Sequence, residues 1–208
     1  MQKENLSNET KVSLISELIE KTKSNHSLPF YNTNEIFVPG IGPLDAKIMI
    51  IGEAPGREES IQGKPFVGRS GQLLSRILSE QGFDRATLFV TNVVKYRPPN
   101  NQTPTHQECM AWAGAYLRKE IEIIQPKIII TLGACATKTF LGEKISISKI
   151  HGNIFETANH KIVPMYHPAY LLRNSNMIKD VKQALNNVKE IHTEIVHNYV
   201  DNLLITCA

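Results

Sequence analysis

The sequence predicts an α/β fold in three layers (α/β/α), with helices on both faces of a central, mainly parallel sheet of four strands. Four short segments are apolar almost without interruption and rich in β-branched residues, which is typical of strands buried on both faces of a parallel sheet. Between them lie segments whose apolar residues recur every three or four positions, as in helices that cover a sheet. This alternation favours right-handed crossovers, and a length of 208 residues is enough for one domain with its own core.

Four elements are expected in the N-terminal half of the chain. An initial helix places Leu14 and Leu18 on one face. A second helix places Leu74 and Leu78 on one face and ends before Gly82. Together with two apolar strands, these elements are a helix over 11–23, a strand over 46–52, a helix over 72–81 and a strand over 88–94.

The C-terminal half is expected to repeat the alternation. A long helical pattern runs into Gln125 and Pro126, and the proline would end it. The last helix begins near Val181 and keeps apolar residues at helical spacing to Ile195. The elements are a helix over 107–124, a strand over 127–133, a strand over 161–166 and the C-terminal helix.

Composition and charge exclude several classes of protein. The three cysteines, Cys109, Cys135 and Cys207, are odd in number and form no C-x-x-C pair, so neither a disulfide framework nor a zinc site is expected. We expect no metal site, and a reducing, cytoplasmic setting is the simplest interpretation. No apolar run is long enough to span a bilayer, so no membrane partner is expected. The formal net charge of +3 permits an anionic partner.

Polar side chains follow three of the four predicted strands. Glu53 follows the first strand, Asn92 ends the second, and His167 follows the last. Ligands of open parallel sheets bind outside the carboxyl ends of the strands, so these three side chains should converge on one crevice.

A carboxylate, an amide and an imidazole together suit the binding and expulsion of a nucleobase. The amide of Asn92 offers a donor and an acceptor for the edge of a pyrimidine, and His167 can donate to a carbonyl that gains charge. Glu53 can hold a water or stabilise a cationic sugar. The glycine-rich segment 63–71 adds Phe66 as a stacking face and backbone amides at a helix start that can take a phosphate.

Four motifs closely resemble those of the uracil-DNA glycosylase superfamily, and most closely its family 4, the thermophile-type enzymes. The motifs are GEAPG at 52–56, GKPFVGRSGQLL at 63–74, TNVVKYRPPN at 91–100 and HPAYLLR at 167–173. The resemblance covers roughly residues 38–173 in matching order and spacing. It implies removal of uracil from DNA by hydrolysis of the N-glycosidic bond, by a single domain over 1–208 with an N-terminal helix and loop at 1–35 and a catalytic core at 36–200.

The resemblance also implies roles for individual residues. Glu53, Asn92 and His167 would be catalytic, because they stand at the motif positions that carry the reaction. The base would be extruded from the duplex and bound by Gly52, Ala54, Phe66, Asn92 and His167. DNA would be contacted by Arg69, Ser70, Lys95, Tyr170, Leu172 and Arg173, with Leu172 or Arg173 filling the hole that the base leaves. The partner would be double- or single-stranded DNA, and the protein a monomer.

The chain departs from family 4 at the cluster that this family carries. Those enzymes hold a [4Fe–4S] cluster with four cysteines, and alignment on the flanking motifs places Asn25, Leu28, Tyr96 and Ala113 at the four positions. None of these is a thiolate, so no iron–sulfur cluster and no other cofactor is expected. Packing by Leu28, Phe30, Tyr31 and Tyr96 is expected to fill its place.

Other functions stay open on the sequence alone. A glycosylase for a modified pyrimidine in foreign DNA would show nearly the same motifs, and a silent module that binds uracil-containing or single-stranded DNA is a second possibility. A uracil-DNA crosslinking relative is disfavoured, because no basic run precedes His106. A phosphate-binding P-loop is rejected, because Pro65 replaces its Ser or Thr. The charged residues Arg57, Glu58 and Glu59 are interpreted as a solvated loop.

Overall fold

The sheet predicted from the apolar runs is present and contains five strands. The computed structural model describes residues 6–31 and 34–206. The strands are β1 (Ile48–Gly52), β2 (Phe89–Asn92), β3 (Ile128–Leu132), β4 (Phe155–Glu156) and β5 (Lys161–Met165), in the order β2-β1-β3-β5-β4. All neighbours pair in parallel except β4, which runs antiparallel to β5. The prediction of four strands was therefore wrong by one strand, the two-residue edge strand β4.

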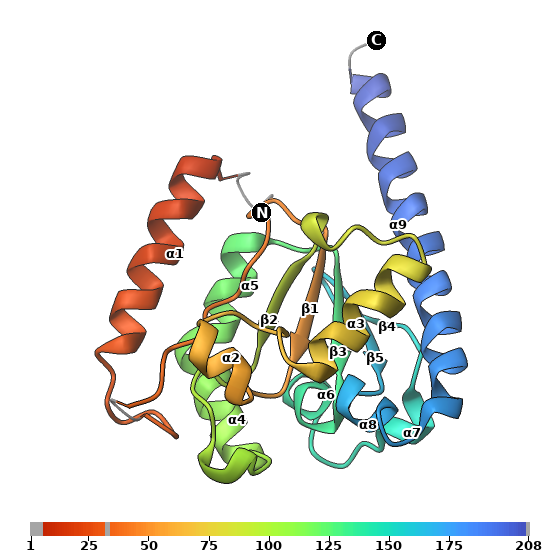
Figure 1. Cartoon of the computed structure of the whole chain (residues 1–208). Helices are drawn as coiled ribbons and strands as arrows, with labels where there is room; N and C mark the ends of the chain where they lie inside the picture. The colour runs from red at the N-terminus through yellow and green to blue at the C-terminus, as the bar shows by residue number, and fades with distance from the viewer. Residues whose placement is uncertain (1–5, 32–33, 207–208) are drawn as a thin grey trace.

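The structure describes nine α-helices together with short 3-10 turns; Figure 1 shows how they are arranged around the sheet. The predicted helices begin a few residues earlier in the structure, and the one predicted over 107–124 is continuous but passes through a π-helical segment, Ala113–Leu117. The helices are α1 (Asn8–Lys23), α2 (Arg57–Gln62), α3 (Arg69–Glu80), α4 (His106–Trp112), α5 (Arg118–Ile124), α6 (Gly133–Leu141), α7 (Ile147–Ile150), α8 (Pro168–Leu171) and α9 (Ile178–Thr206).

Local side chains fix where these helices begin and end. Ser7 accepts a hydrogen bond from the amide of Thr10 and starts α1 three residues before its predicted beginning. Thr105 and Glu108 form a reciprocal capping box at the start of α4. Gln125 adopts a left-handed conformation (φ 58°) that ends α5 directly before Pro126.

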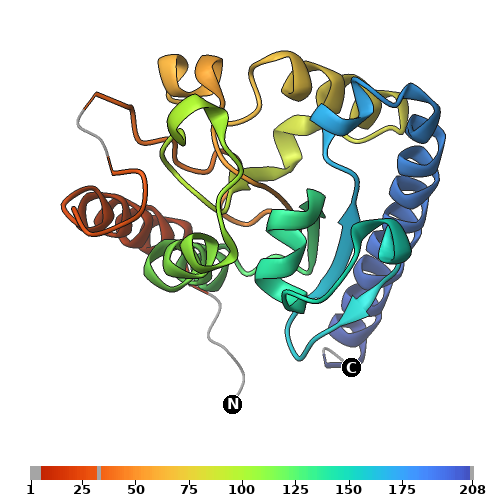
Figure 2. The same ribbon diagram turned by 90° about the horizontal axis from the view of Figure 1, so that it is seen from below.

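Two apolar layers enclose the sheet, as the three-layer prediction requires. Alternate residues of β1 face opposite layers: Met49 and Ile51 pack in the layer that includes α1, α4 and α5, whereas Ile48 and Ile50 pack against α3 and α9. Figure 2 shows α1 (red) beside α5 (green), with α9 (blue) at the opposite side of the molecule. Among the described residues, no helix is long and apolar enough to cross a membrane.

Candidate active site at the carboxyl ends of the strands

A pocket of about 200 Å³, lined by both polar and apolar side chains, lies at the carboxyl ends of β1, β2 and β5. Glu53, Asn92 and His167 all line it, so the structure brings together the three side chains that the strand ends predicted. Pockets for drug-sized ligands span roughly 300–1,000 Å³, so this cavity suits a group of about the size of one base. The complete lining is Glu53, Ala54, Pro55, Gly56, Glu59, Phe66, Ser70, Asn92, Pro98, Asn101, Gln102, His167 and Ala169.

Gly52 allows Phe66 and Asn92 to meet at the floor of this pocket. Gly52 and Asn92 pair across β1 and β2, and a Cβ atom at Gly52 would lie 2.4 Å from Asn92 Oδ1 and 2.4 Å from Phe66 Cζ. Phe66 has a positive φ of 56°, an uncommon conformation for an aromatic residue. Gly71 leaves room for that turn, because a Cβ there would come within 2.0 Å of the Phe66 carbonyl oxygen.

His167 is held as a neutral imidazole. Its Nδ1 accepts a hydrogen bond of 3.2 Å from the amide of Ala169, so the ring hydrogen is on Nε2. Burial lowers the pKa of His167 to about 4, although the negative charge of Glu59 acts in the opposite direction. The ring lies 6.0 Å from that of Phe66, centroid to centroid. At neutral pH the side chain is therefore a hydrogen-bond donor without positive charge.

The carboxyl group of Glu53 has a perturbed acidity. Burial raises its pKa, while a hydrogen bond from the side chain of Thr103 lowers it. The backbone carbonyl of Glu53 accepts from the amide of Val94 at 3.0 Å, which fixes this residue beside the end of β2. Thr103 was not singled out from the sequence, where nothing distinguishes it from other loop threonines.

Glu59 is a pocket residue that the sequence interpretation missed. It lies in α2 and is 7% exposed, so the prediction of a solvated loop was wrong for Glu59, whereas Arg57 and Glu58 are exposed as predicted but form the first turn of a helix. Its Oε1 accepts hydrogen bonds from the amides of Val67 (3.0 Å) and Gly68 (2.8 Å). These two amides are thus not open to the phosphate expected at the start of α3. Instead, Glu59 anchors the turn that carries Phe66.

The segment between β2 and α4 supplies one wall of the pocket. Asn100 and Asn101 both have positive φ values of 53°, and Asn101 and Gln102 face the cavity. Arg97 donates from Nε to Asn101 Oδ1 at 2.8 Å and lies 3.8 Å from Glu35. Among residues other than glycine, Asn is one of those that most often adopt a left-handed conformation, and this is the one signal in the sequence that could have marked the turn.

Lys95 does not reach the surface, which corrects its assignment as a phosphate contact. Its side chain is fully buried, forms an ion pair of 3.0 Å with Glu120, bonds Thr91, and lies 4.6 Å from the ring centroid of Tyr116. Burial lowers the pKa of Lys95, and Glu120 opposes that shift. A phosphate cannot contact an ammonium group enclosed in this way, so Lys95 is a structural residue.

The other predicted DNA contacts either line the pocket or are exposed on the surface. Ser70 lines it, and Arg69 is exposed at the start of α3. Tyr170 is 39% exposed in α8, Leu172 is 45% exposed, and Arg173 is also exposed. These side chains are therefore accessible to a partner, and their contact with DNA stays a prediction.

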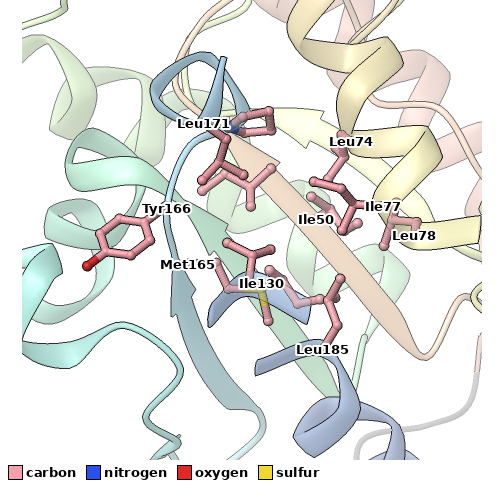
Figure 3. Close-up of a pocket in the computed structure, with 12 residues that line it drawn as sticks. Ile50, Leu74, Ile77, Leu78, Ile130, Met165, Tyr166, Leu171 and Leu185 are labelled. Carbon is pink, nitrogen blue, oxygen red and sulfur yellow. The ribbon is translucent and has the colours of Figure 1, made fainter. Parts of the chain in front are cut away.

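A second, apolar cavity lies between α3, α8 and α9 and plays no part in the candidate chemistry. Its volume is only about 10 Å³, and Figure 3 shows Ile50, Leu74, Ile130 and Leu185 converging on it, while the hydroxyl of Tyr166 points away. A cavity this small with an apolar lining stays dry. It is a packing gap beneath α8.

The region aligned with the cluster of family 4 is filled by an aromatic cluster of Tyr31, Phe37, Tyr96 and Trp112. Tyr96 lies 5.7, 5.5 and 5.8 Å from the rings of the other three, in edge-to-face arrangements typical of stable aromatic pairs. Trp112 donates to the carbonyl of Pro29 at 3.1 Å.

The residues present do not fit a [4Fe–4S] cluster. Leu28 and Tyr96 are buried in the apolar layer, and Asn25 and Ala113 have no thiol either. No group of three or more His, Cys, Asp or Glu side chains able to hold a metal ion is found within the described part of the chain.

Comparison with known proteins identifies the family of this chain. The model of the uracil DNA glycosylase superfamily matches residues 39–189. The chain belongs to this superfamily.

Individual relatives extend that match over most of the chain. A type-4 uracil-DNA glycosylase of Thermotoga maritima is 40% identical over 189 residues, which covers 87% of this chain and 98% of that protein. One from Saccharolobus solfataricus is 45% identical over 163 residues, or 74% of each chain. A type-5 uracil-DNA glycosylase of Pyrobaculum aerophilum is 29% identical over 162 residues, or 68% of this chain and 69% of that protein.

Proposed function

We propose that this member of the superfamily is a monofunctional DNA glycosylase that hydrolyses the bond between uracil and deoxyribose in DNA and leaves an abasic site. One observation carries the proposal: Glu53, Asn92 and His167 surround a single base-sized pocket. The identity of 40% to a type-4 uracil-DNA glycosylase over nearly its whole length supports uracil as the base.

The base must leave the duplex to enter a pocket this recessed. Phe66 stacks on one face of the extruded base, while the amide of Asn92 pairs with its Watson–Crick edge. Gly52 and Ala54 let the base approach the backbone at the end of β1. The 3% exposure of Asn92 supports this role, because a buried amide discriminates strongly between bases that can and cannot pair with it.

His167 stabilises the departing base. As the glycosidic bond breaks, negative charge grows on a carbonyl oxygen of the pyrimidine, and Nε2–H of the neutral His167 donates a hydrogen bond to it. Because the imidazole is neutral, it stabilises this charge without first transferring a proton. The position of the hydrogen on Nε2 follows from the Ala169 amide bond to Nδ1.

Glu53 acts on the sugar side of the bond. Its carboxylate stabilises the positive charge that develops on the deoxyribose and orients the water whose oxygen adds to the anomeric carbon. The proton lost by that water balances the negative charge of the released base. The hydrogen bond from Thr103 favours the ionised carboxylate and partly opposes the rise in pKa that burial causes.

DNA is held by the rim of the pocket. Arg69, Ser70 and Arg173 contact phosphates, and Tyr170 contacts the nucleotide beside the extruded one. Leu172 enters the stack in place of the missing base, which its exposure supports. Lys95 is not part of this surface.

The fold is held without an iron–sulfur cluster in this proposal. The aromatic cluster supplies the packing, and iron determination on the purified protein tests it. Less than one iron atom for every ten chains is expected, whereas about four per chain would refute the proposal.

We further propose that residues 1–208 work as one domain and as a monomer, because one chain supplies the whole pocket lining. The free thiols of Cys109 and Cys135 favour a reducing, cytoplasmic setting. Sedimentation velocity of the full chain tests the monomer, and a dimer at working concentration would refute it.

Excision assays on end-labelled oligonucleotides test the proposed function. The panel contains uracil opposite guanine, uracil opposite adenine, uracil in single-stranded DNA, thymine, cytosine and a bulky modified cytosine, with alkali to cleave abasic sites. We expect cleavage at uracil and none with the His167→Ala variant as the matched control. Cleavage only at the modified base would show that this base, and not uracil, is the substrate. DNA binding without any cleavage would show that the protein is a binding module and not an enzyme.

A further inference from the structure

Two cysteines that the glycosylase chemistry does not use face each other between α4 and α6. Cys109 comes from α4 and Cys135 from α6, and their Sγ atoms lie 2.8 Å apart. A disulfide bond is about 2.05 Å long, so the two sulfur atoms are less than 1 Å from bonding distance. The thiols are 1% and 8% exposed, and both are free.

We propose that Cys109 and Cys135 are a disulfide-forming pair, a covalent modification site that cross-links α4 to α6 when the protein meets a peroxide. The helices need no large movement, because they already pack against each other and both thiols lie in the same apolar layer. The pair is 26 positions apart in sequence, so the bond closes a long loop and constrains the unfolded chain strongly.

The reaction needs one thiolate and one thiol in contact, which this pair supplies. The thiolate of one cysteine attacks a peroxide oxygen and becomes a sulfenic acid, with release of water. The sulfur of the other cysteine then attacks the sulfenic sulfur, the S–S bond forms, and a second water leaves. Two thiols and one hydrogen peroxide give one disulfide and two waters.

The cross-link would join two elements that flank the candidate active site. Cys109 lies six positions after Thr103, whose side chain bonds Glu53. Helix α6, which contains Cys135, begins at Gly133, where a Cβ would lie 3.0 Å from His167 Cβ. The disulfide would therefore link α4, which follows the segment that contains Thr103, to α6, which begins beside His167. We expect it to raise the melting temperature by about 5–10 °C.

The experiment uses the full chain with Cys207→Ser, so that the remaining two cysteines are the proposed pair. After hydrogen peroxide treatment, we expect an intact mass lower by two hydrogen atoms, a linked peptide that contains Cys109 and Cys135, and a higher melting temperature that dithiothreitol reverses. Adding Cys109→Ser or Cys135→Ser should abolish the link and the thermal shift.

Two outcomes would overturn the proposal. One is oxygen added to a single cysteine, or a dimer linked between chains, in place of the internal bond. The other is formation of the internal disulfide without any rise in melting temperature, which would show that the bond does not stabilise the fold. All readouts are mass and thermal stability, so they are independent of whether uracil is the substrate.

Discussion

The pocket and the aromatic cluster are built on the same stretch of chain but contain opposite chemistry. Asn92 lines the pocket, and four residues later Tyr96 is enclosed by aromatic rings. The pocket collects a carboxyl, an amide and an imidazole around open space. The aromatic cluster contains buried rings in edge-to-face contact, where the sequence resemblance placed a metal cluster.

We infer from this difference that separate groups of residues carry out the chemistry and stabilise the fold: the pocket does the first and the aromatic cluster the second. The polar groups around the pocket are those expected for excision of a base, whereas Tyr96 stands where the family resemblance places a cluster thiolate. If the separation holds, substitutions in the aromatic cluster should change stability, and substitutions in the pocket should change the rate of excision.

The largest effect is expected on stability, from Trp112→Ala. Trp112 is fully buried and bonds the carbonyl of Pro29, so its removal leaves a cavity and an unpaired carbonyl. The free energy of unfolding should fall by about 3–5 kcal/mol, as measured by urea denaturation. Trp112→Phe, which keeps a ring, should cost less. A variant that stays folded at the assay temperature yet loses excision would break the separation.

The largest effect on rate is expected from His167→Ala. Loss of a preorganised donor to a charge that forms in the transition state costs about 10²–10³-fold in rate. Single-turnover excision of uracil measures the rate, and fluorescence anisotropy measures DNA affinity, which should change far less. Asn92→Ala should behave in the same way. Equal losses of rate and affinity would contradict a role in the chemical step.

The sequence predicted the sheet and the pocket because both depend on local patterns. Strands buried on two faces are continuous apolar runs, and the polar residues that follow them must gather at one edge of a parallel sheet. Strand β4 was not predicted, because a segment of two residues is too short to show a periodic pattern. It is a strand only because it pairs with β5. The π-helical segment within 106–124 also left no pattern to read.

The missed site residues depend on contacts between distant segments. Glu59 looks solvent-exposed beside Arg57 and Glu58, but one turn of α2 directs it to the amides of Val67 and Gly68. Lys95 looked like a phosphate contact inside a basic motif, and its partner Glu120 is 25 positions away. Such pairings are set by tertiary packing, which a single sequence does not reveal.

The next prediction tests how closely the pocket is packed, through Gly52→Ala. Its methyl group would lie 2.4 Å from Asn92 Oδ1 and from the ring of Phe66, so both must move. A displacement of about 1 Å in a base-reading group costs roughly 10²-fold in rate. The excision rate should therefore fall, by up to about 10²-fold, while urea denaturation should show that the variant is still folded. An unchanged excision rate would contradict the placement of the base against Gly52.

The dependence of the excision rate on acid pH distinguishes the roles of Glu53 and His167. Burial raises the pKa of Glu53, so the rate should fall with decreasing pH through a value above the ordinary 4.5 of a glutamate. His167, with a pKa of about 4, stays neutral over this range and should add no transition near pH 6.5. Thr103→Val removes the bond that lowers the pKa of Glu53, so the acid limb should move to higher pH, while Thr103→Ser should keep it. A pH profile that Thr103→Val leaves in place would contradict Glu53 as the ionised group.

The smallest effect is expected at the rim, from Arg173→Ala. An arginine that contacts one phosphate contributes about one unit to the slope of log affinity against log salt. The variant should lower that slope by about one unit in anisotropy titrations. The double variant Lys95→Met, Glu120→Gln removes the buried charge pair together and should leave the slope unchanged, because neither group reaches solvent. A lower slope in the double variant would mean that Lys95 contacts DNA after all, and that the region behind the pocket opens when DNA binds.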